Sequence, residues 1–261
     1  MSWGSQAYGR ILKGAVLGAV VAGTGACTKE RMVQGECKAF NGADVCTWGR
    51  MSGSTLVAFG ATVPVKSIEN SPAELPMVWP PKSDAVIGMP AEVLAATGFD
   101  HMNIFWEPHG HPPGPYLTPH YDFHFNSITK EAVAAINCAD SLKPAAVPAA
   151  YVLPDVPIPQ LGTLIGLCVP GMGMHALPAA EMTGTEPFKR TMIVGYYHQK
   201  PIFVEPMIAR ATLLEKRTFG VEMPEVAGQP ANVHTPATFE ARYDSTAQAY
   251  QFTFTMAAAR S

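Results

Sequence analysis

Proline sets the main limit on how this chain can fold. The 261 residues include 24 prolines, close to twice the usual share of ~5%. A proline has no backbone N–H to donate and disrupts the interior of a helix. We therefore expect short elements joined by stiff connections. Because all-β domains of ~200–250 residues are routinely single units, one domain is expected.

The remaining sequence favours strands over helices. Three pairs of apolar segments are joined by short polar turns, as in β-hairpins: 45–51 with 56–63, 191–197 with 202–208, and 239–243 with 250–256. Helical spacing predicts a short helix between Pro90 and Gly98 and a longer one over residues 127–139. The sequence thus predicts a mainly β fold, an antiparallel barrel or sandwich with one or two short helices.

The first 27 residues have the composition of an export signal. Arg10 and Lys13 precede an apolar, small-residue stretch over residues 14–26 that ends at Cys27. This stretch is too short and too rich in glycine for a membrane span of ~20 residues. The ending TGAC resembles a lipobox, with threonine where leucine is usual. Ordinary cleavage just before Cys27 and a retained anchor are the alternatives.

The expected organisation has three parts: a signal peptide over residues 1–27, a tether over 28–36, and a single β-rich domain over 37–261. Acyl chains on Cys27 would hold the protein on a membrane, because stable anchoring takes more than one chain. We expect a cell-envelope protein, either a periplasm-facing lipoprotein or a secreted one. The net charge of −3, without a cluster of lysine or arginine, excludes nucleic acid as a main partner.

The four cysteines after Cys27 fit an oxidising compartment and allow three pairings. Cys37 and Cys46 flank an Asn-Gly turn signal, which favours a local bridge between them. A bridge between Cys138 and Cys168 then follows by elimination. The spacings match no zinc knuckle.

Five of the eight histidines fall between His101 and His124. If residues 119–126 form a strand, its period of two puts His120, Asp122 and His124 on one face and three aromatic residues on the other. Imidazole with carboxylate is a common ligand set for zinc, iron, manganese or copper. The alternative is a hydrogen-bonded or solvent-facing strand surface.

Further ligands would have to come from elsewhere in the chain. His120 and His124 are ~13 Å apart at Cα on an extended strand and share one ion only if the strand bends. His175 lies in the glycine-containing segment CVPGMGMHALP. Glu205 lies in the apolar segment IFVEPMI, where an unpaired carboxylate is costly.

Glu205 must therefore be protonated, bound to a metal, or paired with an arginine such as Arg190 or Arg210. We expect four ligands to converge on one divalent ion, with zinc as the first choice: His120, His124, His175 and Glu205. Asp122 and His111 are expected either to hydrogen-bond to these ligands from outside or to act in proton transfer.

Three segments carry a family resemblance: FDHMNIFWEPHGHPPGPYLTPHYDFHF, PGMGMHAL and MIVGYYHQKPIFVEPMI, which cover much of residues 99–208. They resemble an uncharacterised bacterial family with a β-rich structure and an oligomeric assembly, typified by a sigma-E-controlled Thermus protein. The resemblance implies a homo-oligomer and favours the same six site residues, but it assigns no activity. The histidine-rich strand and the later PGxGxH turn are also loosely similar to cupins, with different spacing.

Two functions fit these features. One is a metal-dependent envelope enzyme of unknown substrate, in which a bound ion activates water. The other is a non-catalytic oligomeric binding or envelope-stress protein with structural histidines. A serine or cysteine hydrolase is disfavoured because the sequence contains no GxSxG elbow.

The lipobox interpretation predicts the effect of one substitution. Cys27→Ser should move the protein from the membrane fraction to the soluble extracytoplasmic fraction, because the acylated side chain is removed. Fractionation followed by immunoblotting measures this. A variant that stays as membrane-bound as the wild type would show that Cys27 is not the anchor.

Overall fold

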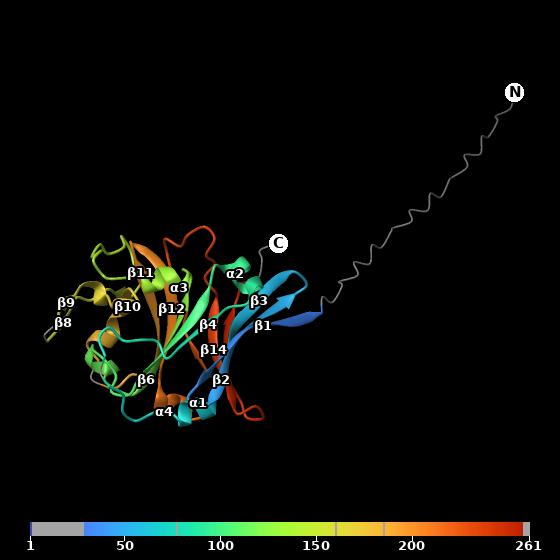
Figure 1. Ribbon diagram of the computed structural model, residues 1–261. Coiled ribbons are helices and arrows are strands. Elements are labelled where there is room, and N and C mark those ends of the chain that lie inside the picture. The colour runs from blue at the N-terminus through green and yellow to red at the C-terminus, as the bar shows by residue number, and fades with distance from the viewer. Residues whose placement is uncertain (2–28, 77, 160, 185, 258–261) are drawn as a thin grey trace.

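Two antiparallel sheets form the framework of the computed structural model, which describes Met1 and residues 29–76, 78–159, 161–184 and 186–257. The first sheet contains, in spatial order, β1 (Glu30–Phe40), β2 (Ala43–Ser52), β3 (Thr55–Pro64), β15 (Ala249–Thr255), β14 (Thr238–Asp244) and β13 (Phe219–Val221). The second contains β4 (Ala85–Gly88), β5 (His101–Glu107), β6 (His120–Asn126), β12 (Lys200–Ala209), β11 (Arg190–Tyr197), β10 (Met174–Pro178) and β7 (Tyr151–Val152). Figure 1 shows the blue and red strands of the chain ends together in the first sheet.

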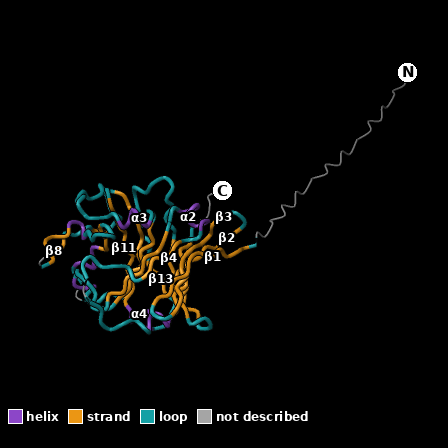
Figure 2. The backbone as a smooth tube through the Cα atoms, in the orientation of Figure 1, coloured by secondary structure: helices purple, strands orange, loops and turns teal. Residues whose placement is uncertain are grey.

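Short helices and a small hairpin connect these strands. The α-helices are α1 (Val65–Glu69), α2 (Ala91–Thr97), α3 (Lys130–Ala134) and α4 (Arg210–Leu214), and the 3₁₀ turns are η1 (Gly114–Tyr116), η2 (Ile165–Leu167) and η3 (Ala179–Met182). The hairpin consists of β8 (Val156–Ile158) and β9 (Gly162–Leu164). In Figure 2 the strands gather in the centre of the molecule and the helices lie around them.

The predicted hairpins and the mainly β class are confirmed. Within the described ranges neither sheet closes on itself, so the fold is a sandwich and the barrel alternative is wrong. The four α-helices exceed the one or two expected, because α1 and α4, each five residues long, lie at strand ends where no helix was expected. The predicted helix after Pro90 is α2, which ends at Gly98 in the left-handed conformation.

Aromatic side chains of β6 fill the space between the two sheets. Phe123 meets Phe252 edge to face with ring centroids 4.8 Å apart, and Phe125 meets Phe254 in the same way at 4.8 Å. Tyr121 belongs to the same buried cluster. Such pairs add about 0.5–1.5 kcal/mol each beyond the burial of their surface. The predicted aromatic face of this strand is therefore confirmed as the core face.

The opposite face of the second sheet is also buried. Irregular segments, 3₁₀ turns and the β8–β9 hairpin cover it. Five of their buried side chains belong to one hydrophobic cluster with side chains of β10, β11 and β12: Tyr116, Ile136, Val156, Leu167 and Phe188. All seven residues of β6 are buried. The polar side chains of this strand thus lie between the sheet and a covering layer, away from solvent.

The expected long helix over residues 127–139 is wrong in its length. Thr129 caps α3, its side chain accepting a hydrogen bond from the Ala132 N–H. The helix stops at Ala134 because the chain turns: the Asn137 side chain binds the Ala139 N–H, and Cys138 has a positive φ of 58°. Side-chain capping of this kind competes with helix continuation.

The expected tether is also corrected. Strand β1 starts at Glu30, inside residues 28–36, and pairs with β2. Most of its side chains are exposed, so it lacks the apolar alternation that marks a strand. Backbone pairing to β2 and the bridge at Cys37 hold it in the sheet.

Both predicted disulfides are confirmed, between Cys37 and Cys46 and between Cys138 and Cys168. They indicate a location outside the cytoplasm. The predicted signal peptide and Cys27 lie outside the described residues. No helix in the described part of the chain is long and apolar enough to cross a membrane.

The two bridges close loops of different lengths, with sequence separations of 9 and 30 residues. In the loop-entropy model, replacing Cys138 and Cys168 with serine should lower the free energy of unfolding by about 3–4 kcal/mol. The same change at Cys37 and Cys46 should cost about 2–3 kcal/mol. Urea unfolding of the two double variants measures both values, and a larger loss for the shorter loop would contradict the expectation.

Candidate metal centre

Six ionisable side chains gather on the covered face of the second sheet in two groups of three. The inner trio is His124, His175 and Glu205, and the outer trio is His111, His120 and Asp122. In each trio the three donor atoms lie within 4.8 Å of one another. These are the six residues that the sequence singled out, but they form two groups where one centre was expected.

Strand register builds the inner trio. β12 pairs with β6 so that Val204 lies opposite Phe125 and Met207 opposite Asp122, which places Glu205 across from His124. Nε2 of His124 is 3.3 Å from Oε2 of Glu205. His124 and Glu205 are both 2% exposed.

His175 reaches this point from β10, on the far side of β11. Its ring centroid is 5.7 Å from that of His124. The ring of Phe203 stacks on His124 at 4.3 Å and meets His175 at 5.3 Å. Phe203 lies directly over Gly195, where any Cβ would overlap the aromatic ring. A glycine at position 195 is therefore needed to accommodate the phenylalanine ring that packs against both imidazoles.

Backbone carbonyls fix three of the four imidazoles. Nδ1 of His175 donates to the Leu167 carbonyl at 2.9 Å, and Nδ1 of His120 donates to the Thr118 carbonyl at 2.7 Å. Nδ1 of His111 donates to the Pro112 carbonyl at 2.9 Å. Since a carbonyl only accepts, each Nδ1 carries a hydrogen. Metal-binding histidines are usually oriented in this way, with Nε2 left to the ion.

The inner trio favours its uncharged forms. Burial lowers the pKa of His124 to about 4, and burial together with His124 lowers the pKa of His175 to about 3. Burial, and after it the negative charge of Asp122, raises the pKa of Glu205 well above its usual value. At neutral pH the two imidazoles keep free lone pairs, and the carboxyl group holds a proton that a cation would displace.

The outer trio favours an ion pair. Nε2 of His120 is 3.2 Å from Oδ1 of Asp122, and Nε2 of His111 is 3.6 Å from Oδ2. Burial opposes ionisation of Asp122, but His120 and His111 outweigh it and lower the pKa of the carboxyl group. Burial also opposes charge on His111, yet the hydrogen bond and charge of Asp122 raise its pKa to about 9.

Several donor atoms of the two trios lack a hydrogen-bond partner. Nε2 of His120, Oδ1 of Asp122 and Oε2 of Glu205 are fully buried, and no hydrogen bond of acceptable geometry reaches them from the described residues. An unsatisfied buried polar atom typically costs about 1–3 kcal/mol. Two imidazoles and one carboxylate facing a common point fit a divalent cation in each trio.

The arginines considered as partners of Glu205 lie elsewhere. Arg190 donates to the Gly220 carbonyl, and Arg210 donates to the carbonyls of Ile68 and Glu69. Pairing of Glu205 with these arginines is therefore not observed.

Two residues of β5 join this polar face without having been predicted. His101 is 1% exposed, and its Nδ1 is hydrogen-bonded to Asp100. Glu107 lies opposite His120 in register, and burial, followed by the charge of Asp122, raises its pKa to about 7. The sequence could have identified these two residues, because the period of two in HMNIFWE places His101, Asn103 and Glu107 on one face of a strand.

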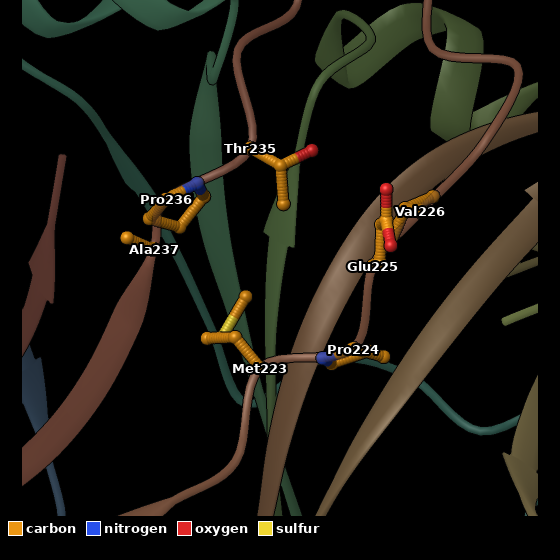
Figure 3. A pocket seen from close by; sticks show the side chains of 7 residues that line it. All are labelled: Met223, Pro224, Glu225, Val226, Thr235, Pro236 and Ala237. Atoms are coloured by element: carbon orange, nitrogen blue, oxygen red, sulfur yellow. The ribbon is translucent and has the colours of Figure 1, made fainter. Parts of the chain in front are cut away.

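Surface cavities lie apart from the six residues. One of about 310 Å³, drawn in Figure 3, is lined by Met223, Pro224, Glu225, Val226, Thr235, Pro236 and Ala237. A larger one of about 710 Å³ lies beside α3 and the turn between β11 and β12. Neither cavity is lined by a member of the two trios.

Comparison with known proteins adds one family. A family model described as TTHB210-like, Hypothetical protein TTHB210, matches residues 55–106. The chain is similar to the TTHB210-like family over this range. The expected resemblance to an uncharacterised family typified by a Thermus protein is confirmed. The TTHB210-like match spans β3 to β5 and ends before the six residues. No curated protein and no solved structure matches the chain.

The lowered pKa of His175 predicts a pH dependence of stability in chelator-treated protein. The unfolded imidazole takes up a proton below about pH 6.5, whereas the folded one resists protonation down to about pH 3. Folding stability due to this group is therefore complete above pH 6.5 and is lost as the pH falls towards 3. The full slope is about 1.4 kcal/mol per pH unit.

His175→Gln removes this contribution. The difference in unfolding free energy between wild type and variant should shrink as the pH falls from 6.5 to 4, as measured by urea titration at each pH. His234→Gln, at an exposed position, serves as the control and should follow the wild type. A constant difference for His175→Gln would mean that its imidazole is protonated in the folded protein.

Proposed function

We propose that this protein is an extracytoplasmic divalent-metal-binding protein whose principal centre is the inner trio. The observation that carries the proposal is the burial of Glu205, with an unpartnered Oε2, 3.3 Å from His124. His175 completes a set of two imidazoles and one carboxylate. Zinc is the favoured ion, because two histidines and one carboxylate are a common protein ligand set for it.

Electrostatics support a cation at this position. Without one, Glu205 stays buried in its protonated form and the carboxyl group lacks a strong partner. A divalent ion would stabilise the ionised carboxylate and accept the lone pairs of both imidazoles. The Leu167 carbonyl on Nδ1 of His175 supplies the outer hydrogen bond that raises the basicity of a ligating imidazole.

The enclosure of the inner trio favours binding over catalysis. Its three residues are between 2% and 9% exposed and lie under the covering layer. The competing candidate is a metal-dependent enzyme of unknown substrate, supported by His111, whose side chain is 34% exposed next to the buried Asp122. In that function the bound ion supplies Lewis acidity, and Asp122 and His111 move the proton.

The cellular setting is part of the proposal. Cys27 carries the lipid anchor, and β1 begins three residues beyond it, at Glu30. This short spacing holds the sandwich close to the membrane surface on the periplasmic side. The homo-oligomer implied by the family resemblance would form on that surface.

Metal analysis of the full chain tests the proposal. Protein exported by its own signal and purified without added ions should contain zinc, and His175→Ala and Glu205→Gln should reduce bound zinc sharply. Inductively coupled plasma mass spectrometry measures the ratio of metal to protein. His234→Ala, at an exposed position, is the control and should keep the wild-type ratio. Protein that binds no divalent ion after incubation with excess zinc would refute the proposal.

A further inference from the structure

We infer that the outer trio, His111, His120 and Asp122, is a second divalent-cation site that forms a pair with the inner one. The inference rests on the proposed function, since it adds an ion to the same polar face. The cations it would take are those that accept imidazole and carboxylate ligands together, such as zinc and manganese.

The donor atoms of the outer trio are arranged for a common ligand. They lie within 4.8 Å of one another. His120 is 0% exposed and Asp122 is 4% exposed, and Nε2 of the former and Oδ1 of the latter lack hydrogen-bond partners among the described residues. These two atoms are 3.2 Å apart, so both point into the same small space.

The orientation of the two imidazoles is set by the main chain. The carbonyls of Thr118 and Pro112 hold the Nδ1 hydrogens of His120 and His111. Both Nε2 atoms therefore face Asp122, one on each carboxylate oxygen. The carboxylate can bind an ion between the two rings without any change in ring orientation.

The two trios are near enough to act as one paired centre. Asp122 and His124 are two residues apart on the same face of β6, ~6.6 Å at Cα. On the neighbouring strand β12, Met207 lies opposite Asp122, so Glu205 lies two residues along the register from Asp122 and opposite His124. The two trios are thus neighbours on one face of the sheet, and each contains one carboxylate. Paired metal sites in enzymes hold their ions ~3.5–4 Å apart around such groups.

Exposure distinguishes the two positions. His111 lies in the loop after β5, and its side chain is 34% exposed, whereas the inner ligands are at most 9% exposed. The outer ion would exchange with solvent and accept an outside ligand, and the inner ion would be enclosed. Chelators should therefore remove the outer ion first.

Zinc stoichiometry of the full chain tests the second site. Saturated wild-type protein should hold two zinc ions per chain after desalting, by mass spectrometry. His111→Ala and Asp122→Asn should each retain one, and His175→Ala should also retain one. The zinc indicator 4-(2-pyridylazo)resorcinol should release one ion from wild type at least ten times faster than the other. His111→Ala should lack the fast phase, and His175→Ala should keep it.

His109→Ala is the matched control, since His109 lies two residues from His111 and is 55% exposed. It should keep both ions and the fast phase. Circular dichroism and thermal unfolding identify any variant that fails to fold. If a variant of a buried ligand does not fold, the zinc content of His111→Ala decides the result, because His111 is the exposed ligand. One ion per wild-type chain, lost with His175→Ala and kept with His111→Ala, would overturn the second site and leave the proposed function standing. No bound ion in the wild type would overturn both.

Discussion

One strand that is buried on both faces, with ionisable side chains on one of them, organises this molecule. β6 lies in the middle of its sheet and all its side chains are buried. Its aromatic face is stabilised by packing against the other sheet, but its polar face must find partners, because an isolated buried ion is very costly. Other segments supply these partners. β12 contributes Glu205, β10 contributes His175, and nearby loops contribute carbonyl groups that accept hydrogen bonds from the imidazoles.

The sequence predicted those elements whose signal is local. Hairpins such as β14 and β15 alternate apolar and polar residues around a turn, so their pairing could be predicted. Two features depended on contacts made elsewhere. The helical pattern of the sequence continues beyond the last residue of α3, because the chain turns at Cys138 to form the bridge with Cys168. β1 is exposed along most of its length, so only its pairing with β2 defines it as a strand.

The members of the candidate site were predictable, but their grouping was not. Histidine and carboxylate at a period of two identified β6, and the cost of burying a carboxylate identified Glu205. Which residues meet depends on strand register, since Glu205 lies opposite His124, and register between β6 and β12 is not encoded in either segment alone. Glu107 was missed because apolar residues interrupt the polar pattern of its segment and because His120, which lies opposite it, belongs to the neighbouring strand.

The disulfide between Cys138 and Cys168 also constrains the surroundings of His175. Leu167, whose carbonyl orients His175, is directly joined to Cys168. The covalent tie that anchors this segment is thus one residue away from the hydrogen bond that selects the His175 tautomer. Closing the bridge restricts the backbone that carries the Leu167 carbonyl and so limits the orientations open to the His175 ring. The redox state of two cysteines and the geometry of one imidazole are thereby linked through a single peptide bond.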